Sequence, residues 1–383
     1  MSAAAHIGHG LGLEPVSSDW PALQQADVEQ VLAYFPQLLG ASSIDWHSPR
    51  PFAAAARVVC AQGAFFIKRH HRRVREASWL LEEHRFVEHL AERGASVVKP
   101  LRGSTGSTVL TLGDWTYEVL PAAPGHDLYR DALSWTPFLS TGHAHSAGQA
   151  LAALHRAAEG FEVPRRATPV LLANLHLFAQ HDPLAAISGA VRAQPALADY
   201  LAAQDWQRTL QELHLPFHRE LLPRLAQQQA LWTHNDWHAS NLLWRDDSAT
   251  AEVASVLDFG LSDRTFALFD LATALERNCV PWLELDHGGR AAADLDGVDA
   301  LLAGYASVRP LSRDDLLTLV ALLPVLHVDF ALSEIAYFHG IVGSRASADV
   351  AYHAFLIGHT EWFRRAEGVR LLDHLRALAR QRA

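Results

Sequence analysis

The first third of the chain carries short apolar and aromatic runs separated by turn residues, a pattern typical of β-strands. Residues 57–60 and 65–68 flank the turn Ala61-Gln62-Gly63-Ala64, which predicts a β-hairpin. Apolar residues at helical spacing predict helices over residues 27–39 and 75–93. Further strands are expected at residues 97–98, 108–112 and 115–120.

From about residue 125 onwards the pattern is mostly helical, with one β-like island at residues 242–258. We therefore expect an α+β chain with a sheet-rich N-terminal lobe and a larger helical C-terminal lobe. The clearest predicted helices of the second lobe are 146–158, 196–215, 270–276 and 316–338. The expected divisions are a loose arm over residues 1–25, the first lobe over 26–120 and the second lobe over 121–383.

The β-like island holds the residues that most clearly indicate chemistry. It contains His234-x-Asp236-x-x-x-x-Asn241, and Asp258-Phe259-Gly260 ends the strand-like run that follows. Phosphoryl transfer from ATP needs a carboxylate that orients the attacking hydroxyl, and oxygen ligands that hold magnesium between the phosphates. Asp236 suits the first role, and Asn241 and Asp258 suit the second as hard oxygen ligands. A hairpin between the two runs would bring Asn241 and Asp258 side by side.

With Asp270-Leu271-Ala272 after them, these motifs resemble those of the aminoglycoside phosphotransferase and choline kinase group, which has the protein-kinase-like fold. The chain is also similar to the bacterial stress-response kinase and homoserine kinase branches of that group. The resemblance implies a bilobal kinase-like fold with a small antiparallel N-terminal sheet, ATP and Mg²⁺ as cofactors, and Asp236 as the catalytic base. It further implies Asn241 and Asp258 as magnesium ligands, with His234 and Asp270 as structural supports of the loop.

Lysine is rare in this chain, with Lys68 and Lys99 as its two examples. Lys68 ends the strand 65–68, where the related kinases place their phosphate-binding lysine. The alternative is a solvated strand end, which the basic run after it would suit. The resemblance pairs this lysine with a glutamate on the next helix, at Glu83 or at the adjacent Glu82.

The rest of the expected nucleotide site is backbone. The adenine is expected to meet the chain around Glu118 to Leu120, because a linker between lobes offers one carbonyl and one amide there. A glycine-rich phosphate loop should precede the first strand of the hairpin, but residues 48–56 contain no glycine. Ser48 and Arg50 are the candidates for phosphate contact in that stretch.

The acceptor site is expected near the predicted helix 316–338, which is apolar nearly all round and therefore buried. Asp329, Ser333 and Tyr337 share one stripe of this helix. A buried carboxylate is costly unless it is paired. Asp329 therefore bonds either an arginine or a backbone amide inside the lobe, or an amine or hydroxyl of the acceptor. The related kinases draw their acceptor site from this region, which makes Asp329 the substrate-binding candidate.

The composition of the chain excludes several classes of partner and environment. The net charge of −10 argues against nucleic acid as a partner and agrees with a cationic acceptor. Cys60 and Cys279 form neither a metal-type spacing nor a disulfide framework, which suits a reducing compartment. The charge-free apolar stretch 316–328 is shorter than the roughly 18 residues that span a bilayer. We expect a cytoplasmic protein without a membrane partner; the sequence leaves its oligomeric state open.

Asp258 and Asp270 lie too close in sequence for the activation segment that docks a peptide in protein kinases, and no Ala-Pro-Glu follows them. We therefore expect phosphate transfer to a hydroxyl of a small, amine-bearing molecule. The alternatives are a Ser/Thr protein kinase of the stress-response type and a non-catalytic nucleotide-binding protein of the same fold. A zinc site at His234 and His238 is disfavoured, because no glutamate follows His234 as in a metalloprotease.

Overall fold

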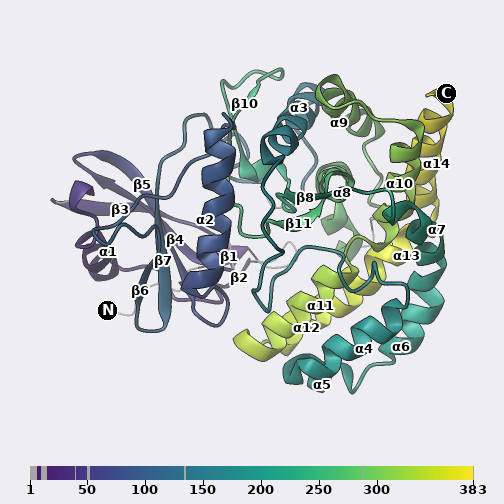
Figure 1. Ribbon diagram of the computed structural model, residues 1–383, viewed down its shortest axis with the longest axis horizontal. Helices are drawn as coiled ribbons and strands as arrows, with labels where there is room; N and C mark the ends of the chain where they lie inside the picture. The colour runs from purple at the N-terminus through teal and green to yellow at the C-terminus, as the bar shows by residue number, and fades with distance from the viewer. Residues whose placement is uncertain are drawn as a thin grey trace.

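The computed structural model describes residues 7–9, 15–38, 40–49, 52–132, 135–287 and 289–382. It has two lobes: a twisted sheet with helices α1 (Gln25–Leu32) and α2 (Ala77–Glu92), and a larger assembly of helices (Figure 1). This arrangement confirms the predicted α+β, kinase-like architecture. The candidate phosphate-contact residue Arg50 lies outside the described residues.

The N-terminal sheet is antiparallel throughout, with the strand order β3-β4-β5-β7-β6. The predicted hairpin is β4–β5, and Gly63 accommodates its turn at a φ of 125°. The apolar face of α1 packs on this sheet, whereas Phe86, Val87 and Leu90 of α2 belong to the core cluster that fills the C-terminal lobe. The strands are β3 (Ser42–His47), β4 (Ala54–Cys60), β5 (Gly63–His71), β6 (Leu110–Leu112) and β7 (Trp115–Pro121).

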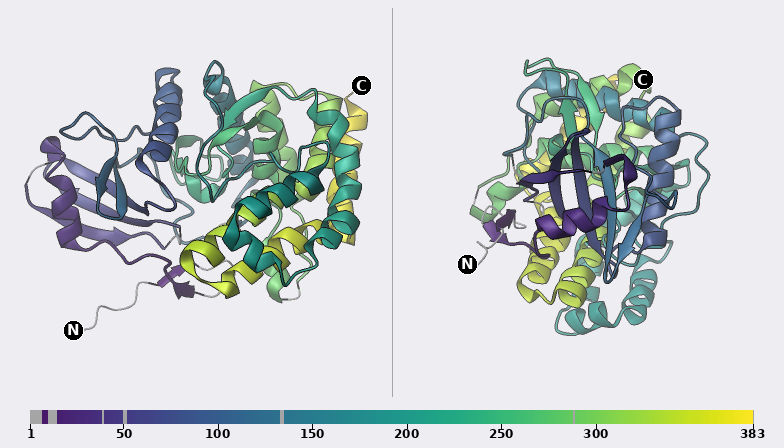
Figure 2. Two further views of the ribbon diagram at one scale, coloured as in Figure 1. Left: turned by 60° about the horizontal axis from the view of Figure 1, so that its bottom comes forward. Right: turned by 90° about the vertical axis from the view of Figure 1, so that its left-hand side faces the viewer.

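Residues before α1 contact the C-terminal lobe. The short strands β1 (Ile7–His9) and β2 (Pro15–Ser17) pair with each other and lie beside the C-terminal helices (Figure 2). The indole of Trp20 donates a hydrogen bond of 3.1 Å to the Tyr337 hydroxyl, which in turn donates one of 2.9 Å to Asp19. Residues 19–20, which the sequence assigns to a loose arm, are therefore hydrogen-bonded to the second lobe; the three-part division of the chain stays a prediction.

The C-terminal lobe is built on a tight pair of helices, α3 and α9. They approach so closely at Gly148 and Gly304 that a Cβ at either position would lie about 2 Å from a backbone carbonyl oxygen of the partner helix. The helices are α3 (Thr141–Ala158), α4 (Pro183–Ala193), α5 (Pro195–Leu201), α6 (Trp206–Thr209), α7 (Leu215–Leu225), α8 (Ala267–Cys279), α9 (Leu295–Val308), α10 (Arg313–Leu322), α11 (Val328–Tyr337), α12 (Arg345–Val350), α13 (Thr360–Trp362) and α14 (Ala366–Gln381).

Three predicted helices differ from those observed. The helix expected over residues 27–39 ends at Leu32 and is followed by a 3₁₀ turn, Pro36–Leu38. The stretch 196–215 is interrupted between α5 and α6, and 316–338 is divided into α10 and α11 by a 3₁₀ turn that contains Pro324. Proline lacks the amide that would continue the helical hydrogen bonds, which explains the interruption at Pro324. By length and composition residues 313–342 could cross a membrane, but 89 % of their most apolar window is buried inside the protein. This run is therefore a core helix pair of the lobe, as its apolar pattern predicts.

Two small antiparallel strand pairs lie within the helical lobe. β9 (Leu242–Trp244) and β10 (Val253–Val256) form the predicted island. β8 (Ala230–Thr233) pairs with β11 (Asp263–Phe266), which the sequence pattern does not predict. Together the two pairs enclose the loop 234–241 and the turn 257–262, where the motif residues lie.

Candidate active site

A cavity of about 440 Å³ lies between the two lobes. Strands of the N-terminal sheet and α2 line one side of it, and residues 240–259 line the other. Segments that are far apart in sequence thus meet at one cavity. The predicted site residues that line it are Lys68, Glu83, Glu118, Leu120, Asn241 and Asp258.

Asn241 and Asp258 lie together at one end of the β9–β10 hairpin. Val256 pairs with Leu242, and the next amide, that of Leu257, donates a 2.9 Å hydrogen bond to the Asn241 carbonyl. Asp258 follows with a φ of 57°, a left-handed conformation that is uncommon for a residue other than glycine. Such conformations concentrate at functional sites. Because both side chains offer oxygen atoms at the cavity wall, the pair fits a magnesium ion.

Lys68 reaches this pair from β5. Its Nζ lies 3.1 Å from Oδ1 of Asp258. Burial would lower the pKa of Lys68, but nearby carboxylates, Asp258 first and then Glu118, outweigh it and raise the pKa. Lys68 is therefore a fixed positive charge facing the cavity.

The partner predicted for Lys68 is engaged elsewhere. Glu83, on α2, accepts a 3.3 Å hydrogen bond from the guanidinium of Arg166. Arg166 enters from the segment between α3 and α4, which the sequence pattern does not place near α2. The predicted Lys68–Glu83 ion pair is therefore replaced by Lys68–Asp258 and Glu83–Arg166. Glu82 instead accepts a hydrogen bond of 3.3 Å from the amide of Ala167.

Asp236 lies beside the metal-type pair. Its Oδ1 bonds the Arg277 guanidinium, and its Oδ2 accepts a 3.1 Å hydrogen bond from the Asn241 amide. His238 Nε2 lies 3.6 Å from the same Oδ2. Burial would raise the pKa of Asp236, but Arg277, with His238, holds it well below its usual range. The carboxylate therefore stays ionised and acts as an acceptor of hydrogen bonds.

Asp270, on α8, holds the start of the loop that carries Asp236. Its two carboxylate oxygens accept hydrogen bonds of 2.8 Å from the amides of His234 and Asn235. Asn235 has a φ of 62°, so this conformation needs the external support. The His155 ring is 3.0 Å from the same carboxylate, and the His234 ring donates to the Leu257 carbonyl at 2.8 Å.

The end of α8 holds the rest of the loop. Asn278 accepts a hydrogen bond from the Ala239 amide and donates one to the Trp237 carbonyl, both at 2.8 Å. Arg277, one residue earlier, bonds the Asp236 carboxylate. Sequence reasoning missed Arg277 and Asn278. Arg277 lies seven residues after Asp270, which places both on one helix face, so this spacing was an available signal.

Comparisons with known proteins agree with this geometry. The model of the phosphotransferase enzyme family matches residues 52–311. The chain belongs to this family. It is 27 % identical over 254 residues to a homoserine kinase of Phenylobacterium zucineum, a match that covers 64 % of this chain and 61 % of that enzyme. The chain thus aligns with less than two thirds of that curated relative.

Solved structures of low sequence identity share the fold. A microcompartment-associated aminopropanol kinase is 17 % identical, with a TM-score of 0.63 and coverage of 91 % of this chain and all of that one. An aminoglycoside phosphotransferase from Alicyclobacillus acidocaldarius is 16 % identical, with a TM-score of 0.52 and coverage of 94 % and 98 %. The expected kinase-like fold and the resemblance to this group are confirmed.

In this member of the family the carboxyl of Glu118 lies inside the N-terminal lobe, between two histidines. It accepts hydrogen bonds of 3.1 Å from His70 and 2.9 Å from His84. Although burial opposes it, these bonds hold the pKa of Glu118 well below its usual range. β7 ends at Pro121, so the linker begins at Ala122, four residues after Glu118 and two after Leu120.

The linker backbone runs along the cavity wall. The Ala122 amide donates to the Ala64 carbonyl at 3.0 Å, on the side of β5. In an extended chain the neighbouring carbonyl of Pro121 and amide of Ala123 then face the opposite side. Pro121 and Ala123 line the cavity together with Glu118 and Leu120, and the expected adenine contact around Glu118 to Leu120 stays a prediction.

Two buried arginines hold the turn Asp258-Phe259-Gly260. Arg75 and Arg166 each donate a 2.8 Å hydrogen bond to the Gly260 carbonyl. Burial, and then the charge of Arg166, lowers the pKa of Arg75 to about 9. Neither arginine stands out in the sequence, because loop contacts follow no periodicity.

Asp329 lies inside the C-terminal lobe. Its carboxylate accepts hydrogen bonds of 2.6 Å from the Leu177 amide and 3.0 Å from the Phe178 amide. Ser333, on the same stripe, accepts a 3.0 Å hydrogen bond from the Leu172 amide. The predicted stripe therefore exists, but it fastens the loop 171–178. We withdraw Asp329 as a substrate-binding candidate, because backbone amides already occupy both of its oxygens.

A different face of α11 is turned toward the Arg277–Asp236 pair. The Arg277 guanidinium carbon lies over the rings of Trp135 and Phe330, 5.6 Å and 5.7 Å from their respective centroids. Glu334 is 1 % exposed, and its Oε2 has no hydrogen-bond partner among the described residues. Burial raises the pKa of Glu334 to about 8, and the charge of Arg277 opposes the rise. The late helix thus does contribute a carboxyl beside Asp236, at a residue the sequence did not single out.

Proposed function

We propose that this phosphotransferase uses ATP and Mg²⁺ to phosphorylate a hydroxyl of a small, amine-bearing molecule. The single observation that carries the proposal is a grouping in which Lys68, Asn241 and Asp258 line the interlobe cavity and Asp236 is hydrogen-bonded to Asn241. It supplies the positive charge, the oxygen ligands and the carboxylate that phosphoryl transfer needs.

The nucleotide half of the proposal rests on the cavity walls. The Pro121 carbonyl and the Ala123 amide would meet the adenine edge, and the Lys68 ammonium would meet the phosphates. Asn241 and Asp258 would hold Mg²⁺, which when bound neutralises charge that develops on the phosphates. Asp258 would exchange its ion pair with Lys68 for the metal, which leaves Lys68 available to the phosphates.

Asp236 would orient the acceptor hydroxyl. Because Arg277 keeps this carboxylate ionised, it can accept the hydroxyl proton as the oxygen–phosphorus bond forms and the bond to the departing ADP breaks. Asn241 bonds the same carboxylate, so the metal pair and the base share one hydrogen-bonded frame. Such a frame keeps the attacking oxygen and the phosphate in line.

The amine of the acceptor is inferred from Glu334, a buried carboxyl near the Arg277–Asp236 pair whose Oε2 has no hydrogen-bond partner among the described residues. The aromatic faces of Trp135 and Phe330 hold the Arg277 guanidinium beside it. The homoserine kinase relatives point the same way, since homoserine carries both an amine and a hydroxyl. Glu334 replaces Asp329 as the candidate contact for the ammonium group.

The test is a panel of acceptors with ATP and Mg²⁺, followed by ³¹P NMR of the products and by ADP release. The panel holds homoserine, short amino alcohols, aminoglycosides, neutral sugars and a generic protein substrate. Turnover with an amino alcohol or aminoglycoside that is lost in Asp236→Asn, while ATP binding is kept, supports the proposal. Labelling of protein alone would favour the stress-response type of kinase, and binding of ATP without any turnover would favour a non-catalytic protein.

A further inference from the structure

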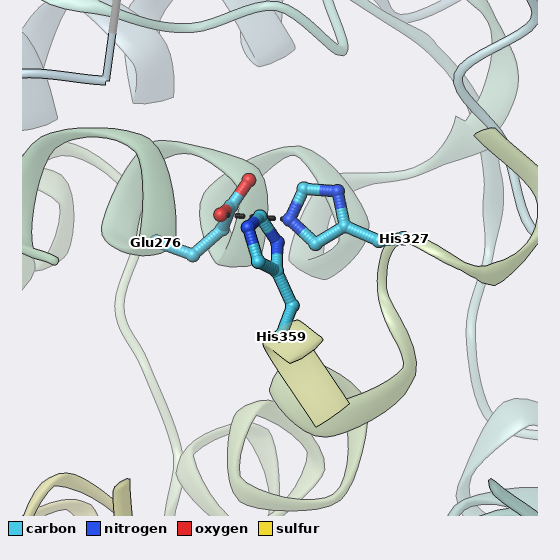
Figure 3. A group of neighbouring side chains, drawn as sticks. All are labelled: Glu276, His327 and His359. Atoms are coloured by element: carbon cyan, nitrogen blue, oxygen red, sulfur yellow. Dashed lines mark hydrogen bonds and ion pairs between the residues drawn. The ribbon is translucent and has the colours of Figure 1, made fainter. Parts of the chain in front are cut away.

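Three buried side chains converge behind Arg277, outside the interlobe cavity. Glu276 comes from α8, His327 from the turn before α11, and His359 from the end of the π-helical segment Ala351–His359. Figure 3 shows the three side chains pointing toward one another from these separate elements. They are 1 %, 8 % and 4 % exposed.

The atoms that meet there are all able to bind a metal. One nitrogen of each histidine and one oxygen of Glu276 lie within 4.8 Å of one another. The His327 Nε2 is 2.8 Å from Oε2 of Glu276. In the described part of the chain, Nδ1 of His359 has no hydrogen-bond partner, and Oε1 of Glu276 has an ion pair of 3.5 Å with Arg277 but no hydrogen bond. Buried polar atoms are nearly always paired, so the unpaired imidazole nitrogen at a convergent cluster points to a bound group.

The surroundings favour a cation. Asp236 and Glu276 bring two negative charges next to the single positive charge of Arg277. The imidazole nitrogens of His327 and His359 are ligands that suit divalent transition metals.

The cluster also has the second layer of contacts that metal ligands need. The Trp282 indole donates a 2.7 Å hydrogen bond to Oε2 of Glu276. The same indole stacks on the His359 ring, with centroids 3.9 Å apart and planes 14° from parallel. These contacts fix the carboxylate and one imidazole in the orientation seen in Figure 3.

We propose that Glu276, His327 and His359 bind a divalent transition-metal ion, and that the ion is Zn²⁺. Two imidazole nitrogens and one carboxylate oxygen form a donor set that suits zinc and leaves a fourth position for water or another ligand. It differs from the oxygen-only pair Asn241 and Asp258, which suits magnesium. Since Glu276 precedes Arg277, the ion would also fix the end of α8 that holds Asp236.

The experiment measures zinc bound by the full chain, without an affinity tag and without nucleotide. Protein is incubated with a slight excess of ZnCl₂ and excess MgCl₂, passed through gel filtration, and analysed by mass spectrometry for metal. We expect about one zinc per chain. We also expect a zinc-dependent rise of the melting temperature, because an ion that binds the folded state stabilises it.

The variants separate a metal site from a packed aromatic cluster. His359→Phe keeps a ring to stack on Trp282 but removes the ligand, so it should lose the bound zinc. His359→Cys supplies a thiolate and should retain it. The control His218→Ala removes a buried histidine that bonds the Gln180 carbonyl, and it should bind zinc like the wild type.

Equal zinc in the wild type and His359→Phe, or no zinc in the wild type, would overturn the proposal. If His359→Phe does not fold, Glu276→Gln and His359→Cys give the same contrast, since the first should lose zinc and the second keep it. Asp258→Asn should bind zinc normally, which separates this site from the magnesium pair. Because nucleotide is absent, the outcome does not depend on the proposed kinase activity.

Discussion

The carboxyl of Asp329 should make the stability of the protein depend on pH. It is 5 % exposed and burial raises its pKa to about 7, from an ordinary value of 3.8, while two backbone amides partly offset the rise. A raised folded-state pKa contributes stability at low pH, and this contribution is lost as the pH rises from 3.8 toward 7. The slope in that window is about 1.4 kcal/mol for each pH unit and flattens near pH 7.

The change that tests this is Asp329→Asn, which removes the titration but keeps the shape. Between pH 5 and pH 7 the wild type should lose about 2 kcal/mol of unfolding free energy relative to the variant. Urea unfolding of both proteins at each pH gives this difference, and other titrating groups cancel in it. At every pH the variant also replaces one accepting oxygen by an NH₂ group, which leaves the Leu177 or the Phe178 amide without its acceptor at a cost of about 1–3 kcal/mol.

Ser333→Ala is the matched control, because Ser333 holds the same loop through the Leu172 amide and does not titrate. The unfolding free energy of Ser333→Ala should differ from that of the wild type by the same amount at every pH. If the unfolding free energy of Asp329→Asn differs from the wild type by the same amount at every pH, Asp329 is not a buried carboxyl with a raised pKa. A large rise in the acceptor KM of Asp329→Asn, with stability unchanged, would instead return Asp329 to the acceptor site.

Four further changes test the proposed site. Arg277→Gln removes the charge partner of Asp236, so kcat should fall about tenfold or more and the melting temperature should drop, whereas the exposed Arg376→Gln should change neither. Asp258→Asn should abolish the magnesium dependence of ATP binding in calorimetry, and Lys68→Ala should weaken ATP binding with magnesium present; an unchanged magnesium dependence would exclude Asp258 as a ligand. Glu334→Gln should raise KM for an amine acceptor and leave KM for ATP unchanged. Because the pKa of Glu334 is about 8, the wild-type acceptor KM should fall as the pH rises toward 8, and a flat profile would contradict the role.

The site residues that could be predicted are those that lie in contiguous sequence motifs. Asn241 and Asp258 could be placed together because a hairpin fixes the register of its ends, and the pairing of Val256 with Leu242 bears this out. The partners of Asp329 could not be found in this way. They are backbone amides in the irregular loop 171–178, about 150 residues earlier, and neither periodicity nor residue type marks an amide as a partner.

Helix α8 shows how the unpredicted contacts complete the predicted ones. Asp270 holds the amides that begin the catalytic loop, Arg277 holds the carboxylate at its centre, and Asn278 holds the backbone at its end. A loop with a left-handed residue at Asn235 is costly alone, so a single rigid helix contacting it at three points keeps that conformation populated. The same helix carries Glu276 toward His327 and His359. A metal ion bound at that cluster would therefore influence the position of Asp236, because its ligand Glu276 and the Asp236 partner Arg277 are adjacent residues of one helix.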